Sequence, residues 1–308
     1  MIAAGPSTAR APVAFIGLGA MGAPMASCLL RKGWALRVHD ARPAAVAALA
    51  SENCSSAATP GAAAQGVGTT LCMVSTTEQL RAVLNGEGGI LSTPLTPGHR
   101  VVVMSTVDPV AFRGMTTQAA AAGVTLIDAP VSGGVTGARD GTLTVMIGGE
   151  AEAVANCGDI FSAIARHVFH VGPTGAGLAM KLVNNLLIQT NIVVLCEALV
   201  LGVKAGLDPG VIRDVVNAST GRSFVFQTRV PRILARDFVS EGTVDISCKD
   251  QDLQLAFAEQ LGVPLLMTNT SRHLFRLAQA NGLGRSDAAA VIQVIERLAD
   301  VVVEAQST

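Results

Sequence analysis

The stretch Phe15-Ile16-Gly17-Leu18-Gly19-Ala20-Met21-Gly22 decides the fold. It places three glycines in GxGxxG spacing after an apolar run that predicts a strand, and at the opening of a helical pattern. The first glycine of such a turn permits the tight bend, the second lets the backbone approach a pyrophosphate, and the third allows close packing of helix on strand. The motif is weak without context. The candidate phosphate-binding residues are Gly17, Leu18, Gly19, Ala20, Met21 and Gly22.

Polar residues at two predicted strand ends supply that context. Asp40 ends the second strand, where an acidic group accepts a hydrogen bond from a ribose 2'-hydroxyl. The same carboxylate would repel a 2'-phosphate, so NAD is favoured over NADP, although Arg42 could partly offset the repulsion. Ser105 and Thr106 lie at the carboxyl end of another predicted strand, where ligands bind in open α/β sheets; a capping hydroxyl is the alternative for Ser105.

The sequence pattern alternates between strands and helices in the first half of the chain and is helical in the second half. Up to residue 171, near-continuous apolar runs alternate with Ala-rich helical stretches, which predicts a doubly wound parallel sheet covered on both faces. The predicted strands are Val13–Ile16, Leu36–His39, Leu71–Val74, Val101–Ser105, Val124–Ile127, Leu143–Ile147 and Val168–Val171. Beyond a Gly/Pro cluster only helices are expected, at 178–205, 209–218, 247–261, 264–281 and 287–305. We therefore expect a Rossmann-type NAD-binding domain over 1–171, with 1–11 a loose tail, and an all-helical substrate and oligomerisation domain over 172–308, joined by a long helix.

Composition excludes several classes of protein. A formal net charge of -1 and a pI of about 6.5 give no electrostatic footprint for nucleic acid. The mean hydropathy of +0.47 raises the question of a membrane. The longest apolar stretch, Leu182–Val203, contains three asparagines, a glutamine and a glutamate, which predicts a buried helix of a soluble protein instead. The run Val13–Ile16 is too short for a signal peptide, so a cytoplasmic location is expected.

The remaining composition points to assembly and to reduced thiols. Apolar helices in the second half exceed what one small bundle needs, which favours a homodimer or homotetramer. Six dispersed cysteines in mostly apolar segments favour buried, reduced thiols. No histidine, cysteine or carboxylate spacing suggests a metal site.

A second constellation combines a strand end with a helix. Asp128-Ala129-Pro130-Val131-Ser132-Gly133-Gly134 offers a hydroxyl from Ser132 and the backbone amides of Gly133 and Gly134, a nest suited to a carboxylate, although the pattern could equally be a turn. Lys181 and Asn185 share one face of the most apolar helix. A lysine there is unfavourable to bury without a role, and the alternative is a side chain that snorkels to the surface.

These motifs together resemble the β-hydroxyacid dehydrogenase family, the group of 3-hydroxyisobutyrate dehydrogenase, tartronate semialdehyde reductase and L-threonate dehydrogenase. The likeness spans residues 13 to about 256. The matching stretches are Gly17 to Gly22, Asp128 to Gly134, Gly175-Ala176-Gly177 with Lys181 and Asn184-Asn185, and Lys249-Asp250.

The resemblance implies a role for each of these positions. Ser132, Gly133 and Gly134 would hold the substrate carboxylate, Lys181 would be the catalytic acid/base, and Asn185 would orient the substrate. Lys249 would reach the cofactor from the helical domain. The family commonly reads Lys-Asp-Leu, whereas this chain reads Lys249-Asp250-Gln251-Asp252-Leu253, which leaves the packing of the helix start in doubt.

The expected activity is that of an NAD-dependent 3-hydroxyacid dehydrogenase, with reversible hydride transfer between the nicotinamide and the hydroxyl carbon of a small 3-hydroxy acid. Burial and the charge of Lys249 would lower the pKa of Lys181 for this task. One alternative is an NAD(P)H-dependent reductase of tartronate semialdehyde, succinic semialdehyde or glyoxylate. An imine reductase and a non-catalytic NAD-binding sensor or scaffold are others. The roles of Arg139, Arg222 and Phe224 stay open.

Overall fold

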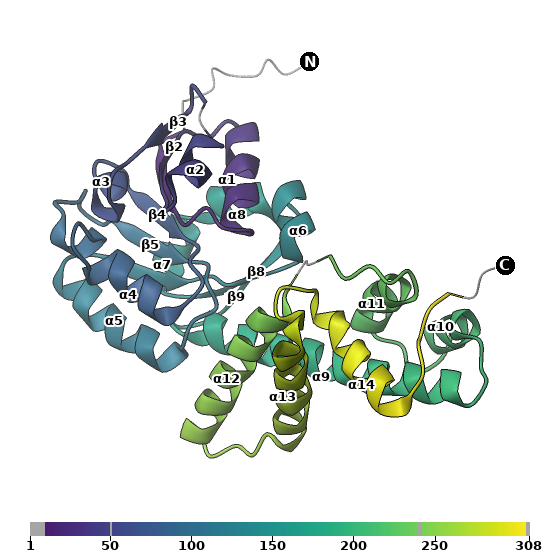
Figure 1. Cartoon of the computed structure of the whole chain (residues 1–308). Coiled ribbons are helices and arrows are strands. Elements are labelled where there is room, and N and C mark those ends of the chain that lie inside the picture. Colours follow the sequence, from purple (N-terminus) through teal and green to yellow (C-terminus); the bar gives the residue numbers. More distant parts are fainter. Residues whose placement is uncertain (1–9, 50, 240–241, 306–308) are drawn as a thin grey trace, which may run out of the picture. The chain divides into compact units, whose positions relative to one another are not determined.

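The computed structural model describes residues 10–49, 51–239 and 242–305, and its chain path is shown in Figure 1. The chain divides into two compact units, of which the N-terminal unit ends at Lys181 and the C-terminal unit begins at Leu182. The predicted loose tail, 1–11, falls mostly outside the described residues. At its end, the Arg10 guanidinium lies 5.2 Å from the ring centre of Trp34.

The N-terminal unit is built on one sheet, in which the described residues form nine strands in the order β3-β2-β1-β4-β5-β6-β8-β7, with β9 on β8. Strands β3, β2, β1, β4, β5 and β6 run parallel. The predicted Rossmann-type fold is thus confirmed, but β8 runs antiparallel to β6 and β7, which the sequence did not predict. The strands are β1 (Val13–Ile16), β2 (Leu36–His39), β3 (Cys54–Ser56), β4 (Thr69–Cys72), β5 (Arg100–Val103), β6 (Thr125–Asp128), β7 (Val131–Ser132), β8 (Leu143–Gly148) and β9 (Ala165–Gly172).

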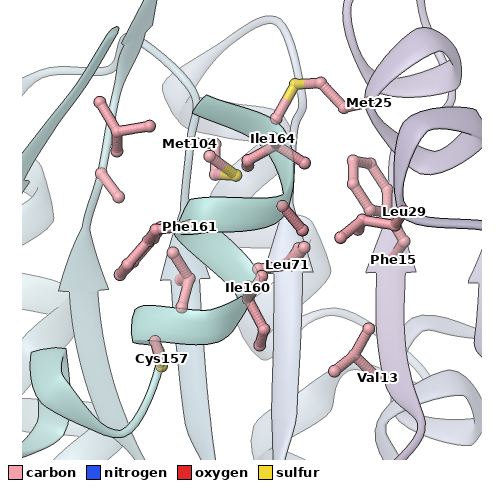
Figure 2. Close-up of a cluster of buried hydrophobic side chains, with 14 of the residues drawn as sticks. Val13, Phe15, Met25, Leu29, Leu71, Met104, Cys157, Ile160, Phe161 and Ile164 are labelled. Carbon is pink, nitrogen blue, oxygen red and sulfur yellow. The ribbon is translucent and has the colours of Figure 1, made fainter. Parts of the chain in front are cut away.

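Helices cover both faces of this sheet. Val13 and Phe15 pack with residues of α1 and α8 in the cluster of Figure 2, while Ala14 and Ile16 pack with α3, α4 and α5 on the other face. Burial of each large side chain there contributes about 1.5–3 kcal/mol, which explains the continuous apolar strands. The helices are α1 (Gly22–Arg31), α2 (Pro43–Ala47), α3 (Pro60–Ala64), α4 (Thr77–Asn85), α5 (Pro109–Ala121), α6 (Gly134–Asp140), α7 (Ala151–Ala155) and α8 (Gly158–Ile164), with a 3-10 turn at Ile90–Ser92.

The C-terminal unit is helical, and its described residues form no strand. Helix α11 was not predicted, since Pro231 interrupts its pattern. The predicted helix over 287–305 is wrong beyond Ala299, because Asp300 adopts a left-handed conformation with φ of 49°. The elements are α9 (Ala176–Lys204), which starts in the N-terminal unit, α10 (Pro209–Asn217), α11 (Phe224–Leu234), α12 (Val244–Gln260), α13 (Leu266–Ala278) and α14 (Ile292–Ala299), with a π turn at Gln279–Leu283 and a 3-10 turn at Ala288–Val291.

Helix α9 is the one helix within the described ranges that is long and apolar enough to cross a membrane by length and composition, and 39% of the relevant window is buried. It nevertheless carries the buried polar side chains Lys181, Asn185 and Gln189. Core helices of soluble proteins pass the same composition test, so the helix is weak support for a membrane span.

Candidate active site

The three glycines of the β1–α1 turn differ in what the chain demands of them. Gly17 has a φ of +90°, and an added Cβ would overlap the Met73 carbonyl oxygen. At Gly22 the Cβ would overlap the carbonyl oxygen of Gly17, whereas at Gly19 it would meet no protein atom within 4 Å. The N-cap of α1 makes no side-chain hydrogen bond, and its first turn holds no acidic residue. The turn therefore leaves open space beside free backbone donors, which fits a pyrophosphate.

Asp40 lies at the carboxyl end of β2 and contacts this turn. Its Oδ2 accepts a hydrogen bond from the Leu18 N–H (2.6 Å), and its Oδ1 accepts from the backbone N–H (2.8 Å) and Nε (3.1 Å) of Arg42. Partial burial would raise the pKa of Asp40, but the hydrogen bonds from Arg42 and Leu18 outweigh it and lower the pKa. The carboxylate is thus ionised and held against the glycine-rich turn, while Arg42 stays 65% exposed in its side chain.

The other predicted cofactor residues lie where β5 ends. Ser105 is fully buried, and its hydroxyl accepts a hydrogen bond from the Val74 N–H at 2.8 Å. This contact joins the carboxyl ends of β4 and β5, so the hydroxyl has a structural partner, but it is not a helix cap because the N-cap of α5 is Asp108. Thr106 follows and is half-buried. Because β1 lies between β2 and β4, these strand ends surround the point where the strand order reverses, the usual ligand crevice of such sheets.

The predicted carboxylate nest follows β7. Ser132 pairs with Thr144 of β8 and is half-buried. Gly133 (φ +128°) and Gly134 (φ +63°) both adopt backbone conformations that residues with a side chain rarely take, and α6 begins at Gly134. The positive φ values explain why two glycines stand here, and they leave the backbone amides unobstructed.

Lys181 lies in the second turn of α9 and is only 9% exposed. The start of this helix is held by Asp128, at the end of β6, whose carboxylate accepts hydrogen bonds from the N–H groups of Gly175 (2.6 Å) and Leu178 (2.8 Å). Burial raises the pKa of Asp128, and these backbone hydrogen bonds oppose the rise. The sequence motif contains Asp128, but no role was predicted for it.

Asn185 and Lys249, both in the C-terminal unit, share one partner. The Asn185 amide donates to Oδ2 of Asp250 at 2.7 Å, and the Lys249 ammonium lies 3.0 Å from Oδ1 of the same carboxylate. Asp250 is buried. It thereby fixes two residues that the sequence predicts to be functional, although it was itself assigned no role. The only signal in the sequence was its place beside Lys249.

The residue after Asp250 departs from the family pattern and makes one hydrogen bond to a neighbouring helix. Helix α12 starts at Val244, with Thr243 as its N-cap, so Lys249 lies in the second turn rather than at the helix start. Gln251 is fully buried, and its amide donates to the Ser271 hydroxyl at 2.8 Å. A polar residue can stand where an apolar one is common because α13 supplies it with a partner.

The predicted residues therefore fall into two groups, one in each unit. The N-terminal group comprises Gly17 to Gly22, Asp40, Ser105, Thr106, Ser132, Gly133, Gly134 and Lys181, and the C-terminal group comprises Asn185 and Lys249. Of the residues with open roles, Arg139 forms an ion pair with Asp140 (2.9 Å), and Arg222 and Phe224 are exposed. Among the described residues no group of three or more His, Cys, Asp or Glu could hold a metal ion.

Known proteins resemble both units. Residues 12–172 match the model of the NAD binding domain of 6-phosphogluconate dehydrogenase, and residues 175–295 match that of the NAD-binding domain of NADP-dependent 3-hydroxyisobutyrate dehydrogenase. The 2-(hydroxymethyl)glutarate dehydrogenase of Eubacterium barkeri is 40% identical over 94% of this chain and 96% of its own length. The L-threonate dehydrogenase of Cupriavidus necator is 35% identical over 92% and 95%, respectively.

A solved structure agrees with these relatives. The 3-hydroxyisobutyrate dehydrogenase of Salmonella typhimurium superimposes with a TM-score of 0.82 at 32% identity, over 92% of this chain and 100% of that one. Matched models of NAD-binding domains on both halves, with dehydrogenases as full-length relatives, define an NAD(P)-dependent oxidoreductase that acts on CH–OH groups. Within that class, the chain belongs to the β-hydroxyacid dehydrogenase family.

Proposed function

We propose that this protein is an NAD-dependent 3-hydroxyacid dehydrogenase that reversibly oxidises the hydroxyl carbon of a small 3-hydroxy carboxylic acid. The observation that carries the proposal is the burial of Lys181, which is 9% exposed on a largely apolar helix. Burial of an ammonium group is unfavourable, and general acid/base catalysis is the use that the family implies for it.

The residues around the strand-order reversal fit a dinucleotide, since Gly19 leaves space that the protein itself does not fill. Gly17 to Gly22 would bind the pyrophosphate and Asp40 the ribose hydroxyls, with Ser105, Thr106 and Lys249 as further contacts. When bound, NAD supplies the hydride acceptor or donor. NAD is preferred to NADP because the ionised Asp40 carboxylate faces the place of a 2'-phosphate, a preference that Arg42 weakens.

The chain's own residues then bind the substrate and move one proton. Ser132, with the backbone amides of Gly133 and Gly134, holds the substrate carboxylate. Neutral Lys181 takes the proton of the substrate hydroxyl at its Nζ as the hydride leaves the carbon that bears this hydroxyl, and it returns the proton in the reverse reaction. Asn185 orients the substrate, with its amide fixed by Asp250 at 2.7 Å.

The substrate class follows from shared chemistry. The names of the relatives include 2-(hydroxymethyl)glutarate and L-threonate, and both molecules carry a hydroxyl on the carbon β to a carboxylate. A reductase of tartronate semialdehyde, succinic semialdehyde or glyoxylate would use the same residues in the opposite direction. A panel of hydroxy acids and semialdehydes with both cofactors distinguishes these activities.

We further infer which function each half of the chain performs and where in the cell the protein is located. Residues 1–171 would bind NAD, and residues 172–308 would complete the substrate site and mediate oligomerisation. The buried polar side chains of α9, Lys181, Asn185 and Gln189, support a soluble cytoplasmic protein over a membrane protein. The balanced charge supports partners limited to small molecules and copies of this chain.

Helix α9 supplies the argument for a homo-oligomer. Met180, Leu187, Val194 and Leu201 recur at every seventh position and are between 40% and 72% exposed. A seven-residue apolar repeat is the pattern of a helix seam that packs on another helix. We propose that this seam is buried in a homodimer or homotetramer.

The proposed activity is tested by replacing Lys181. The Lys181→Met variant should lose about 10²–10⁴-fold in kcat for its best 3-hydroxy acid while NADH binding is kept. Binding is measured by energy transfer from Trp34, the single tryptophan in a chain without tyrosine. Retention of wild-type turnover would refute the assignment, and absence of turnover in the wild type across the panel would favour a non-catalytic NAD-binding protein.

The matched control is Lys204→Met on the same helix. Lys204 caps the end of another helix by donating to the carbonyl oxygens of Ala299 (2.8 Å) and Asp300 (3.1 Å). We expect this variant to lose some stability and to keep the wild-type kcat. A loss of activity common to both variants would show that the assay reports on folding.

A further inference from the structure

We infer that Asp128 is a positioning residue whose buried carboxylate fixes the first turn of α9 and thereby places Lys181 for proton transfer. The inference rests on the proposed function, in which Lys181 is the acid/base. Every residue that carries it lies in the N-terminal unit.

The first step is the contact between strand and helix. Asp128 ends β6, a strand paired with β5 and β8, and its side chain is fully buried. Its two oxygens accept the N–H groups of Gly175 (2.6 Å) and Leu178 (2.8 Å). Backbone N–H groups at a helix start have no partner within the helix, so this carboxylate supplies what α9 lacks.

Two glycines make the approach possible. A Cβ at Gly148 would stand 2.6 and 2.7 Å from the two carboxylate oxygens of Asp128. At Gly177 it would stand 2.9 Å from Oδ2 of the same group and would overlap the Met146 carbonyl oxygen. Neither glycine has a positive φ, so close approach rather than backbone conformation explains them. The helix start lies against the carboxylate with no room for a side chain.

The third step leads from this turn to the amine. Leu178 is fully buried in the cluster that packs under α3, α4 and α5. Lys181 follows Leu178 by about 4.5 Å along the helix axis and shares a face with Gly177. Because the helix is continuous from Ala176, a shift of its first turn moves Lys181 with it.

The charge of Asp128 has an effect beyond the cap. Thr59, Thr76, Ser223 and Thr243 cap other helices of this chain with neutral hydroxyls, and the aspartates that cap α5 and α10, Asp108 and Asp208, are half-buried. A buried, charged carboxylate is less favourable as a helix cap than a neutral hydroxyl, and the raised pKa of Asp128 reflects that unfavourable burial of charge. A negative charge one turn from Lys181 opposes the positive helix terminus and favours the protonated amine. The same residue therefore fixes the place of Lys181 and sustains its ability to hold a proton.

The test compares Asp128→Asn with Asp208→Asn. Asp208 caps α10 through the N–H of Val211 at 2.8 Å and belongs to no proposed site. For Asp128→Asn we expect kcat to fall at least about tenfold, since misplacement by about 1 Å costs roughly 10²-fold. We also expect the acid limb of the pH profile of kcat/KM for oxidation to move to lower pH, while NADH affinity stays within about threefold.

The possible results of these experiments distinguish a failure of the positioning role from a failure of the proposed function. A wild-type kcat in Asp128→Asn beside an inactive Lys181→Met overturns the inference and leaves the proposed function intact. A loss of kcat with an unmoved acid limb assigns Asp128 a structural role only and also overturns it. An active Lys181→Met contradicts the proposed function itself. Asp208→Asn should match the wild type in kcat and pH profile, and a parallel change there would overturn the positioning role.

A second variant serves if Asp128→Asn does not fold. In Gly177→Ala the carboxylate keeps its charge, but the added Cβ displaces the first turn of α9. We expect a loss of kcat with the acid limb near its wild-type position and NADH binding intact. A wild-type kcat in that variant overturns the inference, because the helix start would then not determine the place of Lys181.

Discussion

Asp40 provides the sharpest test of how this protein selects its cofactor. Its carboxylate accepts three hydrogen bonds, from the Leu18 N–H (2.6 Å) and from the backbone N–H (2.8 Å) and Nε (3.1 Å) of Arg42. The lowered pKa keeps the group ionised at neutral pH. The variant Asp40→Asn keeps the shape of the side chain and removes the charge. It should shift the preference from NAD towards NADP.

Two effects add to the size of that shift. Loss of a charged acceptor for the ribose hydroxyl weakens NAD binding by about 1.5 kcal/mol, the lower end for charged hydrogen bonds, because an amide oxygen can still accept. Removal of the repulsion between Asp40 and a 2'-phosphate gains about 1–2 kcal/mol, because the site is open to solvent and Arg42 is 65% exposed. The ratio of kcat/KM for NAD to that for NADP should therefore fall roughly a hundredfold.

Initial rates with both cofactors at saturating hydroxy acid measure this ratio, and energy transfer from Trp34 measures binding separately. The double variant Asp40→Asn/Arg42→Ala identifies what receives the phosphate. If Arg42 binds it, the second change should remove about tenfold of the gain for NADP. A ratio within threefold of the wild type in Asp40→Asn would refute the reasoning, since neither the hydrogen bond nor the repulsion would then exist.

Three further predictions concern stability and assembly. Gly19→Ala should leave the melting temperature unchanged and weaken NADH binding at least tenfold, whereas Gly22→Ala should lower the melting temperature. Equal NADH binding in Gly19→Ala and the wild type would contradict the pyrophosphate site. The pKa of Asp128 is raised above 3.8, so the folded protein binds the Asp128 proton more tightly than the unfolded chain does. The free energy of unfolding, measured in urea, should therefore decrease as the pH rises through the raised pKa. In Asp128→Asn this decrease with pH should be absent. Leu201→Glu should have a lower mass in light scattering than the wild-type oligomer. Leu261 is exposed outside the α9 seam, so Leu261→Glu should keep the wild-type mass. An unchanged mass in Leu201→Glu would contradict an interface at this seam.

The parts of the fold that local pattern determines could be predicted from the sequence. Strands β1 and β2 have the predicted bounds, because four apolar or alternating residues before a turn leave few alternatives. Strands β3 and β7 were missed. The two residues of β7 are too few to form a pattern, and the antiparallel pairing of β8 with β6 and β7 is a contact between strands that local spacing does not specify.

Some parts of the candidate site could likewise be predicted from local sequence, whereas others depend on packing. The glycine-rich turn and Lys181 stand out by type and spacing alone. The link between Asn185 and Asp250 joins residues far apart in the chain, and it exists only because α9 and α12 pack together. Ser105 is comparable, since its bond to Val74 depends on the neighbouring positions of β4 and β5. Spacing identifies the candidate functional residues, whereas packing determines which residues hold them in place.

Positions that the fold does not require are therefore the most informative about function. Gly17 and Gly22 are required by the chain itself, because a side chain at either would overlap a carbonyl oxygen, and both would be glycine without any ligand. Gly19 has no such requirement, so of the three it alone argues for a bound group. Asp128 is the converse case: a hydroxyl would cap α9 without a buried charge, yet a carboxylate stands there. We therefore attribute the charge to the proposed role of Lys181, which follows Leu178 by about one turn of the helix.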